Sequence, residues 1–185
     1  MIRSNHYEAA FEAYLRERRV GFIAIDETKR SILGRQNIKS ADFIIVGPET
    51  AKLVVDVKGR KFPSGTSGGR TWQNWAEEQD IDGLTRWATE FGASFRAVFA
   101  FVYQIQPPYE LTPGTPDLFR FHDKTYLMRA IGVAEYRLHM RVRSVKWGTV
   151  HLPVEAFRAM VRPFSEFLAN PVILTPGDAA RLPSA

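Results

Sequence analysis

Hydrophobic residues in the first part of the chain recur at two different spacings. Between Asn5 and Arg19 they fall on one helical face, which predicts a helix with Asn5 as its N-terminal cap. Short apolar runs then predict three strands, at 20–25, 43–46 and 52–58. Turn-forming residues lie between these runs, so we expect the strands to be joined by hairpin-like turns.

A second helix and a fourth strand complete this pattern. Residues 80–91 carry apolar side chains at helical spacing and are followed by Gly92, which is typical of a helix C-terminus. The long apolar run 97–105 predicts a buried strand, and because it follows a helical crossover we expect it to pair in parallel. The order helix, three strands, helix, strand predicts an α/β fold, with a mixed sheet flanked by helices.

A proline-rich loop separates this core from a C-terminal α+β extension. Residues 118–131 predict two short strands around a turn, and residues 134–142 predict a helix. We expect a further strand at 149–152 and a helix over 154–167, which Pro163 kinks or splits.

These patterns divide the chain of 185 residues into three parts. The predicted core covers residues 1–105, and the extension, expected to pack on the core, covers residues 106–170. Residues 171–185 show little pattern beyond proline and glycine and predict an irregular tail. The length fits one domain with a small appendage.

Composition limits the chemistry. The chain has no cysteine, which excludes disulfides and thiolate metal sites, so a metal would need oxygen or imidazole ligands. No apolar run is long enough to cross a membrane and no signal-peptide pattern is present, so a cytoplasmic protein without a membrane partner is expected. The net charge of +5 and a pI of about 9.6 favour an anionic partner such as nucleic acid, although many soluble proteins are basic for other reasons.

Two charged residues interrupt the apolar strand predicted at 52–58. Side chains alternate between the two faces of a strand, so Asp56 and Lys58 share one face while Val55 and Val57 share the other. Buried strands rarely carry charges, and an exposed ion pair would contribute only about 0–1 kcal/mol. The pair therefore indicates a functional site, although an ion pair at the end of the sheet is the alternative.

Asp42 opens the preceding predicted strand, so hairpin pairing would bring its carboxylate toward that of Asp56, if the register allows. Neighbouring carboxylates repel each other unless a cation lies between them, and Mg²⁺ often binds one or two carboxylates together with water and phosphate oxygens. Lys58 could then hold an attacking water or stabilise negative charge on a phosphate.

The motif Asp42, thirteen residues, Asp56-Val57-Lys58 resembles the signature of the PD-(D/E)XK, or restriction-endonuclease-like, nuclease superfamily. Members share the order of elements predicted above, and many carry a glutamate on the first helix, where this chain has Glu8. The spacing is similar to that of archaeal Holliday junction resolvases, and the resemblance covers roughly residues 3–105. One letter departs from the pattern, because Ala41 rather than proline precedes Asp42.

The resemblance implies a restriction-endonuclease-like fold and a metal-dependent endonuclease acting on DNA, structure-specific in repair or recombination. Its implied cofactor is Mg²⁺ or Mn²⁺, and a homodimer is an assembly that such nucleases often form. Asp42, Asp56, the Val57 carbonyl and Glu8 would bind the metal, and Lys58 would be the catalytic lysine. The alternatives are a nucleic-acid-binding protein that keeps the fold without cutting, an RNA-directed nuclease and a part of a larger complex.

Glu8 and the basic residues have simpler interpretations as well. Glu8 lies three residues after Asn5, so a capping box with Asn5 could by itself explain its position, without any role as a metal ligand. The segment 59–69 is predicted to be a flexible basic loop, and a set of basic residues in and beyond it is expected either to contact nucleic-acid phosphates or to be a solvated surface. This set comprises Arg60, Lys61, Arg70, Arg143 and Lys146. For the nearby Trp72 and Trp75, core packing is favoured over stacking on a base.

Overall fold

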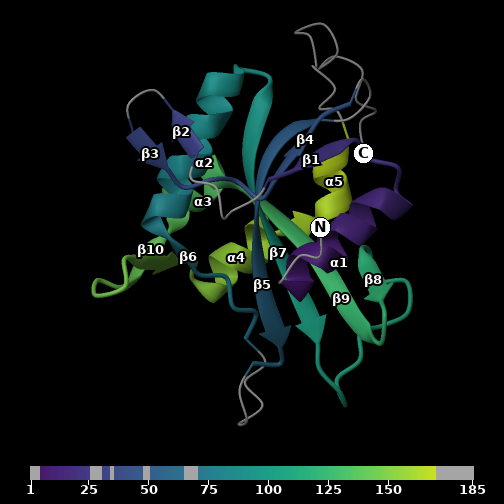
Figure 1. Ribbon diagram of the computed structural model, residues 1–185. Helices are drawn as coiled ribbons and strands as arrows, with labels where there is room; N and C mark the ends of the chain where they lie inside the picture. Colours follow the sequence, from purple (N-terminus) through teal and green to yellow (C-terminus); the bar gives the residue numbers. More distant parts are fainter. Residues whose placement is uncertain (1–4, 26–30, 34–35, 48–50, 65–70, 170–185) are drawn as a thin grey trace, which may run out of the picture.

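The computed structural model describes residues 5–25, 31–33, 36–47, 51–64 and 71–169, with backbone only for 31–33 and 36–38. Its centre is a seven-stranded mixed sheet with the strand order β1-β4-β5-β7-β9-β12, and β8 pairs with β9 (Figure 1). Two smaller sheets are formed by β10-β11-β6 and by β2-β3. Arg70, which is predicted to contact nucleic acid, and the predicted irregular tail at 171–185 lie outside the described residues.

The helices are α1 (His6–Glu17), α2 (Glu78–Phe91), α3 (Val133–His139), α4 (Val154–Met160) and α5 (Phe164–Leu168). The strands are β1 (Phe22–Ala24), β2 (Ser31–Leu33), β3 (Gln36–Ile38), β4 (Phe43–Ile45), β5 (Lys52–Phe62), β6 (Ala76–Glu77), β7 (Phe95–Ile105), β8 (Leu118–Phe121), β9 (Lys124–Gly132), β10 (Arg141–Ser144), β11 (Thr149–His151) and β12 (Arg162–Pro163). None of these helices is both long and apolar enough to span a membrane.

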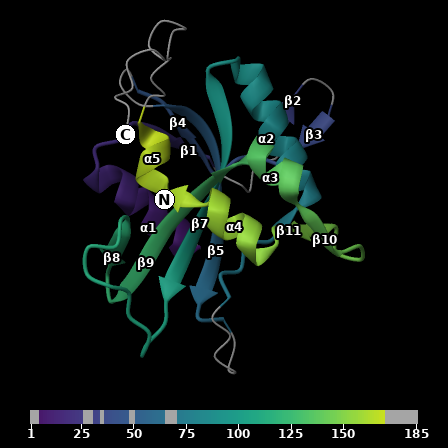
Figure 2. The same cartoon turned by 180° about the vertical axis from the view of Figure 1, so that it is seen from behind.

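Helices cover both faces of the central sheet. Residues of α1 and α5 share one core with the Leu53, Val55 and Val57 side of β5. Residues of α2, α3 and α4 share the second core with Val54 and with the aromatic side chains of β7. Figure 2 shows α2, α3 and α4 together on the side that faces the viewer. The predicted α/β class, a mixed sheet flanked by helices, is confirmed.

The order predicted for the first 105 residues is also present. Asn5 caps α1, because its side chain accepts a hydrogen bond from the Tyr7 backbone N–H at 3.0 Å. Strands β1, β4 and β5 pair antiparallel, and β7 then pairs in parallel with β5 after the α2 crossover. The β2–β3 hairpin lies within a segment that the sequence pattern treats as a polar connection.

Strand β5 is longer than predicted. It continues through Gly59 to Phe62 and pairs with β7 along its whole length, so the prediction of a flexible loop starting at Gly59 is wrong. Phe62 explains the difference, because it is buried and its ring stacks on Trp72 at a centroid distance of 3.5 Å. Local composition around Gly59 favours a loop, but the long-range pairing and the burial of Phe62 outweigh it.

The C-terminal residues join the central sheet. The predicted strand pair around residues 122–124 is present as β8 and β9, and β9 pairs antiparallel with β7 from Val98↔Gly132 to Ile105↔Thr125. Pro163 splits the last predicted helix into α4 and α5, as expected. The helix predicted over 134–142 is wrong at its end, because α3 ends at His139 and residues 141–144 pair with β11.

Candidate functional site

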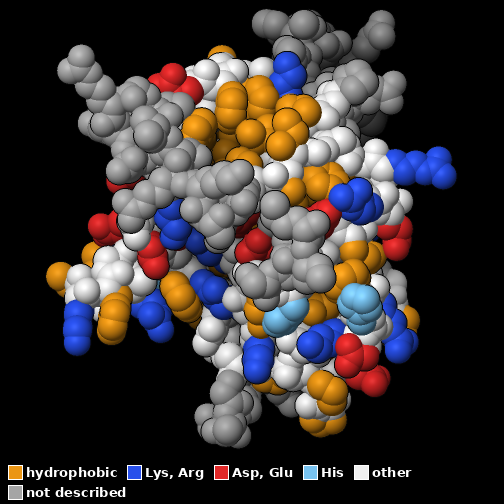
Figure 3. Space-filling model, viewed as in Figure 1, with side chains coloured by type: hydrophobic (Ala, Val, Ile, Leu, Met, Phe, Trp, Pro, Cys, Tyr) orange, Lys and Arg blue, Asp and Glu red, His pale blue; other side chains and the backbone are white. Residues whose placement is uncertain are grey.

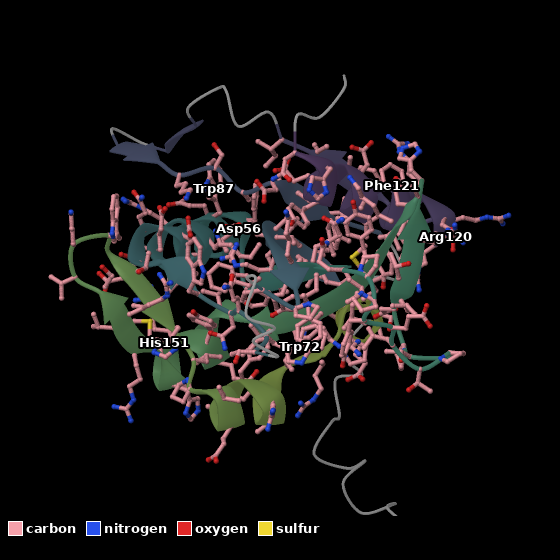
Figure 4. All side chains as sticks on the ribbon, turned by 90° about the horizontal axis from the view of Figure 1, so that it is seen from below. Asp56, Trp72, Trp87, Arg120, Phe121 and His151 are labelled. Atoms are coloured by element: carbon pink, nitrogen blue, oxygen red, sulfur yellow. The ribbon has the colours of Figure 1, made fainter. Side chains whose placement is uncertain are left out.

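Side-chain alternation along β5 places Asp56 and Lys58 on the face that α2 covers. Val54 belongs to the core on that face, while Val55 and Val57 belong to the core beneath α1. Asp56 is buried at 6% exposure, although it is charged and flanked by apolar residues. In Figure 4, Asp56 lies in the middle of the molecule, far from both Arg120 and His151.

The register of β4 and β5 brings Asp42 to the same place. Phe43 pairs with Val55, so Asp42, one residue earlier, lies across from Asp56, one residue later. The Asp42 carboxylate is buried, and its Oδ2 accepts a hydrogen bond from the Val57 backbone N–H at 2.5 Å. This contact holds the Asp42 carboxylate against the backbone between Asp56 and Lys58.

Lys58 lies between two carboxylates, of which the sequence motif includes only one. Its Nζ donates to Asp56 Oδ2 at 2.9 Å and to Asp80 Oδ2 at 2.6 Å. Asp80 belongs to the first turn of α2 and also accepts a hydrogen bond from the Glu77 backbone N–H at 2.9 Å. The spacing of Glu77 and Asp80 before an apolar run is a capping-box signal, which could have marked the helix start but not a contact with Lys58.

A second lysine contacts the same carboxylate. Lys39 Nζ forms an ion pair with Asp80 Oδ1, and it lies 3.3 Å from Glu77 Oε2. Asp56, Asp80, Lys58 and Lys39 therefore form one network of alternating charge between β5, α2 and the segment that precedes β4. In this network each carboxylate faces at least one ammonium group, which limits the cost of burying it.

Burial and pairing shift the proton affinities of this network in different directions. Burial raises the pKa of Asp56 above its ordinary value, although Lys58 acts against that rise. Burial would also raise the pKa of Asp80, but Lys58 and Lys39 outweigh it and hold the pKa below its ordinary value. For Lys58, burial would lower the pKa, but Asp56 and Asp80 outweigh it and raise the pKa, so the ammonium stays charged.

Glu8 lies on α1, the helix that covers the face of the sheet opposite to α2. It lies in the first turn of α1, is largely buried, and its Oε1 accepts a hydrogen bond from Asn5 Nδ2 at 2.6 Å. Helix α1 approaches β5 closely at this point, because the Tyr7 ring packs directly on Gly59. Glu8 therefore lies in the turn of α1 that contacts β5 just beyond Lys58, and it takes part in the helix cap as well.

The carboxylate oxygens of Asp42 and Asp56 are of the chemical type that hard divalent cations such as Mg²⁺ prefer. Within the described part of the chain, no three acidic or histidine side chains converge as a complete metal cage. Mg²⁺ does not require one, because it commonly binds one or two carboxylates and keeps several waters. Asp42 and Asp56 are two buried carboxylates that could ligate such a cation, and a nearby cation would favour the ionised form of Asp56 that burial disfavours.

The predicted nucleic-acid contacts differ in their surroundings. The Arg60 guanidinium makes its contacts within the protein. It donates to the Gly59 and Trp75 carbonyls and stacks 3.9 Å from the centre of the Trp75 ring. Lys61 is exposed at the end of β5. Arg143 and Lys146 are exposed on and beside β10, and the Arg143 guanidinium lies 5.2 Å from the centre of the same Trp75 ring. Trp72 and Trp75 are both half-buried.

Comparisons with known proteins agree with this geometry at the level of the fold. No protein-family model matches the chain, and no curated protein has a significantly similar sequence. The chain does resemble the solved structure of Hjc, a Holliday junction resolvase from Archaeoglobus fulgidus, with a TM-score of 0.52 at 12% sequence identity. The match covers 87% of this chain and 96% of the other, so it extends beyond the 1–105 core into the C-terminal strands. The chain therefore shares the fold of this resolvase, in agreement with the predicted restriction-endonuclease-like fold.

Proposed function

We propose that this protein is a divalent-metal-dependent endonuclease that hydrolyses DNA phosphodiester bonds, with a preference for branched substrates in repair or recombination. One observation supports the proposal above the others. Asp42, directly before β4, lies across from Asp56 of β5, and Lys58 follows Asp56 on the same face of β5. The fold shared with a Holliday junction resolvase supports the choice of branched DNA.

In this proposal Asp42 and Asp56 hold Mg²⁺ or Mn²⁺, with Glu8 and the Val57 carbonyl as further ligands. The bound cation would polarise the phosphate and lower the pKa of a bound water. Asp42 is fixed for this role by the Val57 backbone N–H.

Lys58 acts in the same proposal as a donor to the reacting phosphate. An ammonium group has three N–H donors, and the described contacts of Lys58 use two of them, to Asp56 and Asp80. The third can be donated to a phosphate oxygen, where it would stabilise the charge that develops during attack. Asp80 keeps Lys58 protonated and restricts its position.

The second candidate is a nucleic-acid-binding protein that does not cut. The observation that favours it is the ion-pair network, since Lys58 and Lys39 already neutralise Asp56 and Asp80 without any metal ion. A nuclease with Mg²⁺ and a binding protein would behave alike in DNA affinity. They differ in whether DNA is cleaved and in whether substitution of Asp56 or Lys58 lowers the cleavage rate of protein that still folds.

Cleavage of a four-way junction, of a linear duplex and of duplex RNA in Mg²⁺ tests the proposal. We expect cleavage of the junction, reduced by about 100-fold or more in Asp56→Asn and in Lys58→Ala. Lys52→Ala is the matched control, because Lys52 is exposed at the other end of the same strand and should retain activity. Light scattering would show whether the active species is a homodimer, the assembly that the resemblance implies.

No cleavage of any substrate by folded wild-type protein that binds DNA would favour the second candidate. Equal rates for wild type and Lys58→Ala would contradict the role of Lys58. Preferential cleavage of RNA would keep the site and change the substrate.

A further inference from the structure

The β10–β11 hairpin, residues 141–151, carries an unusual surface. No acidic residue occurs from Tyr136 to Val154, whereas the same segment contains four basic residues, Arg137, Arg141, Arg143 and Lys146. The hairpin, which we call the basic arm, projects from the body of the molecule in both ribbon views (Figures 1 and 2). Figure 3 shows Lys and Arg side chains beside hydrophobic ones in this projecting region.

Hydrophobic side chains at the tip of the basic arm are exposed to solvent. Val145 is 88% exposed, Trp147 is 70% exposed and Val142 is 61% exposed. Strand β10 is the edge of its three-stranded sheet, so one side of it has no neighbouring strand among the described residues. Large apolar side chains that gather in one exposed place usually mark a binding surface, and here they are interleaved with positive charge.

The basic arm is fixed to the elements that build the candidate site. Strand β11 pairs with β6, and the Glu78 backbone N–H donates to the Gly148 carbonyl at 2.9 Å. Both contacts lie within four residues of Asp80 in the chain. The tip of the arm is thereby held at a defined position relative to the N-terminus of α2.

A cation–aromatic stack joins the arm to β5 as well. The Trp75 ring has the Arg60 guanidinium at 3.9 Å on β5 and the Arg143 guanidinium at 5.2 Å on β10. Arg60 follows Lys58 by two residues on the same strand face, so the stack connects the catalytic strand of the proposed site to the arm.

We infer that the basic arm binds duplex DNA beside the scissile strand, with Arg141, Arg143 and Lys146 on phosphates and Trp147 stacked on a base exposed at a branch. This inference rests on the proposed function and adds to it the surface that selects branched DNA. A two-stranded ribbon fits the major groove of B-form DNA, whereas the deep and narrow major groove of duplex RNA excludes it. Stacking on an aromatic ring requires an unpaired or partly unstacked base, which a branch provides and a continuous duplex does not.

Charge argues against a second copy of the chain as the occupant. The described part of the arm has no acidic side chain of its own, and the chain carries a net charge of +5, so two arms facing each other would repel. The negative charge of a polyanion such as DNA complements the positive charge of the arm. Self-association through the arm is the competing outcome, which the experiment below separates from DNA binding.

The test measures DNA binding without cleavage, with Ca²⁺ in place of Mg²⁺, by fluorescence anisotropy on a four-way junction and on a linear duplex. We expect Trp147→Ala to weaken junction binding about tenfold and duplex binding by less than threefold. We expect R143A/K146A to weaken both and to reduce the slope of log affinity against log salt by about two. The controls are Arg120→Ala, an exposed arginine on β8 at the far side of the molecule, and Ile23→Ala, an exposed apolar residue on β1.

The inference and the proposed function fail in different ways. If Asp56→Asn binds the junction like wild type while R143A/K146A does not, the arm binds DNA whether or not the protein cuts it. If the arm variants bind and cleave like wild type, the inference is wrong and the nuclease proposal stands. If they change the mass measured by light scattering and leave DNA affinity unchanged, the arm is a contact between copies, which also overturns the inference.

Discussion

Asp80 determines how the charges around Lys58 are arranged. Its carboxylate forms ion pairs with Lys58, at 2.6 Å, and with Lys39, and it accepts a hydrogen bond from the Glu77 backbone N–H. The Asp80 side chain is almost completely buried. Buried ion pairs contribute little when both partners are present, but removing one partner leaves an uncompensated charge. Loss of the Asp80 carboxylate would therefore destabilise the fold, and it would also remove a contact that sets the position of Lys58.

Asp80→Asn should lower the free energy of unfolding by about 2 to 3 kcal/mol at neutral pH, because two ammonium groups lose their shared counter-charge. Asp82→Asn is the matched control on the same helix, since Asp82 is exposed and its pair with Arg137 contributes about 0–1 kcal/mol. Urea unfolding of both variants measures the difference. Equal stability for the two variants would mean that the network around Asp80 contributes nothing to folding.

At the residue scale, the sequence showed the acid and the base on β5 but not their partner on α2. Alternation along an apolar strand is a local pattern, so Asp56 and Lys58 were visible in the sequence. Asp80 is visible only as a helix-capping residue, because its contact with Lys58 depends on how α2 crosses β5. Glu8 was ambiguous in the sequence, and the structure adds its contact with Asn5 without excluding a role as a ligand.

At the element scale, the packing of α1 on β5 depends on a glycine. A Cβ at Gly59 would lie 2.2 Å from the Tyr7 ring, far inside van der Waals contact. Any side chain at Gly59 would therefore push the first turn of α1, which carries Glu8, away from the strand that carries Lys58. The close approach explains why the chain has a glycine within a strand, where glycine is otherwise unfavourable.

Gly59→Ala should destabilise the protein by about 1 to 3 kcal/mol through overpacking. Gly132→Ala is the control, because a Cβ there would meet no atom within 4 Å, and it should change stability far less. The double variant G59A/Y7A removes the clash, so its loss of stability should be smaller than the sum of the two single losses. Strict additivity in thermal or urea unfolding would contradict the proposed contact.

Elements were predictable where local pattern and long-range pairing agree. Helix α1, the β4–β5 pair and the α2 crossover followed from periodicity and turn residues alone. The last four residues of β5 did not, because their local composition favours a loop while β7 and the burial of Phe62 hold them in the sheet. Strand β10 was missed for a similar reason, since its pairing with β11 determines its conformation.

At the scale of the whole molecule, the C-terminal residues complete the sheet. Strand β9 pairs with β7, and β12 pairs with β9. Phe164 of α5 is fully buried and packs against Phe11 of α1 at a ring distance of 4.8 Å. The core on the α1 face is therefore shared between the two ends of the described chain, which sequence pattern alone could not show.

A fragment of residues 1–105 should consequently fail to fold cooperatively. It would leave the long edge of β7 unpaired and expose the face of Phe11 that Phe164 covers. Circular dichroism and hydrogen exchange of the fragment and of residues 1–170 check this expectation. Cooperative unfolding of the shorter fragment would show that residues 1–105 form an independent domain.

The central claim is that Asp42 and Asp56 hold a divalent cation next to Lys58, and calorimetric titration of the protein with Mn²⁺ tests it most directly. We predict saturable binding to wild type and to the control Asp82→Asn, and loss of that binding in the folded Asp42→Asn and Asp56→Asn variants. Binding that persists unchanged in Asp56→Asn, or no binding to folded wild type, would contradict the account.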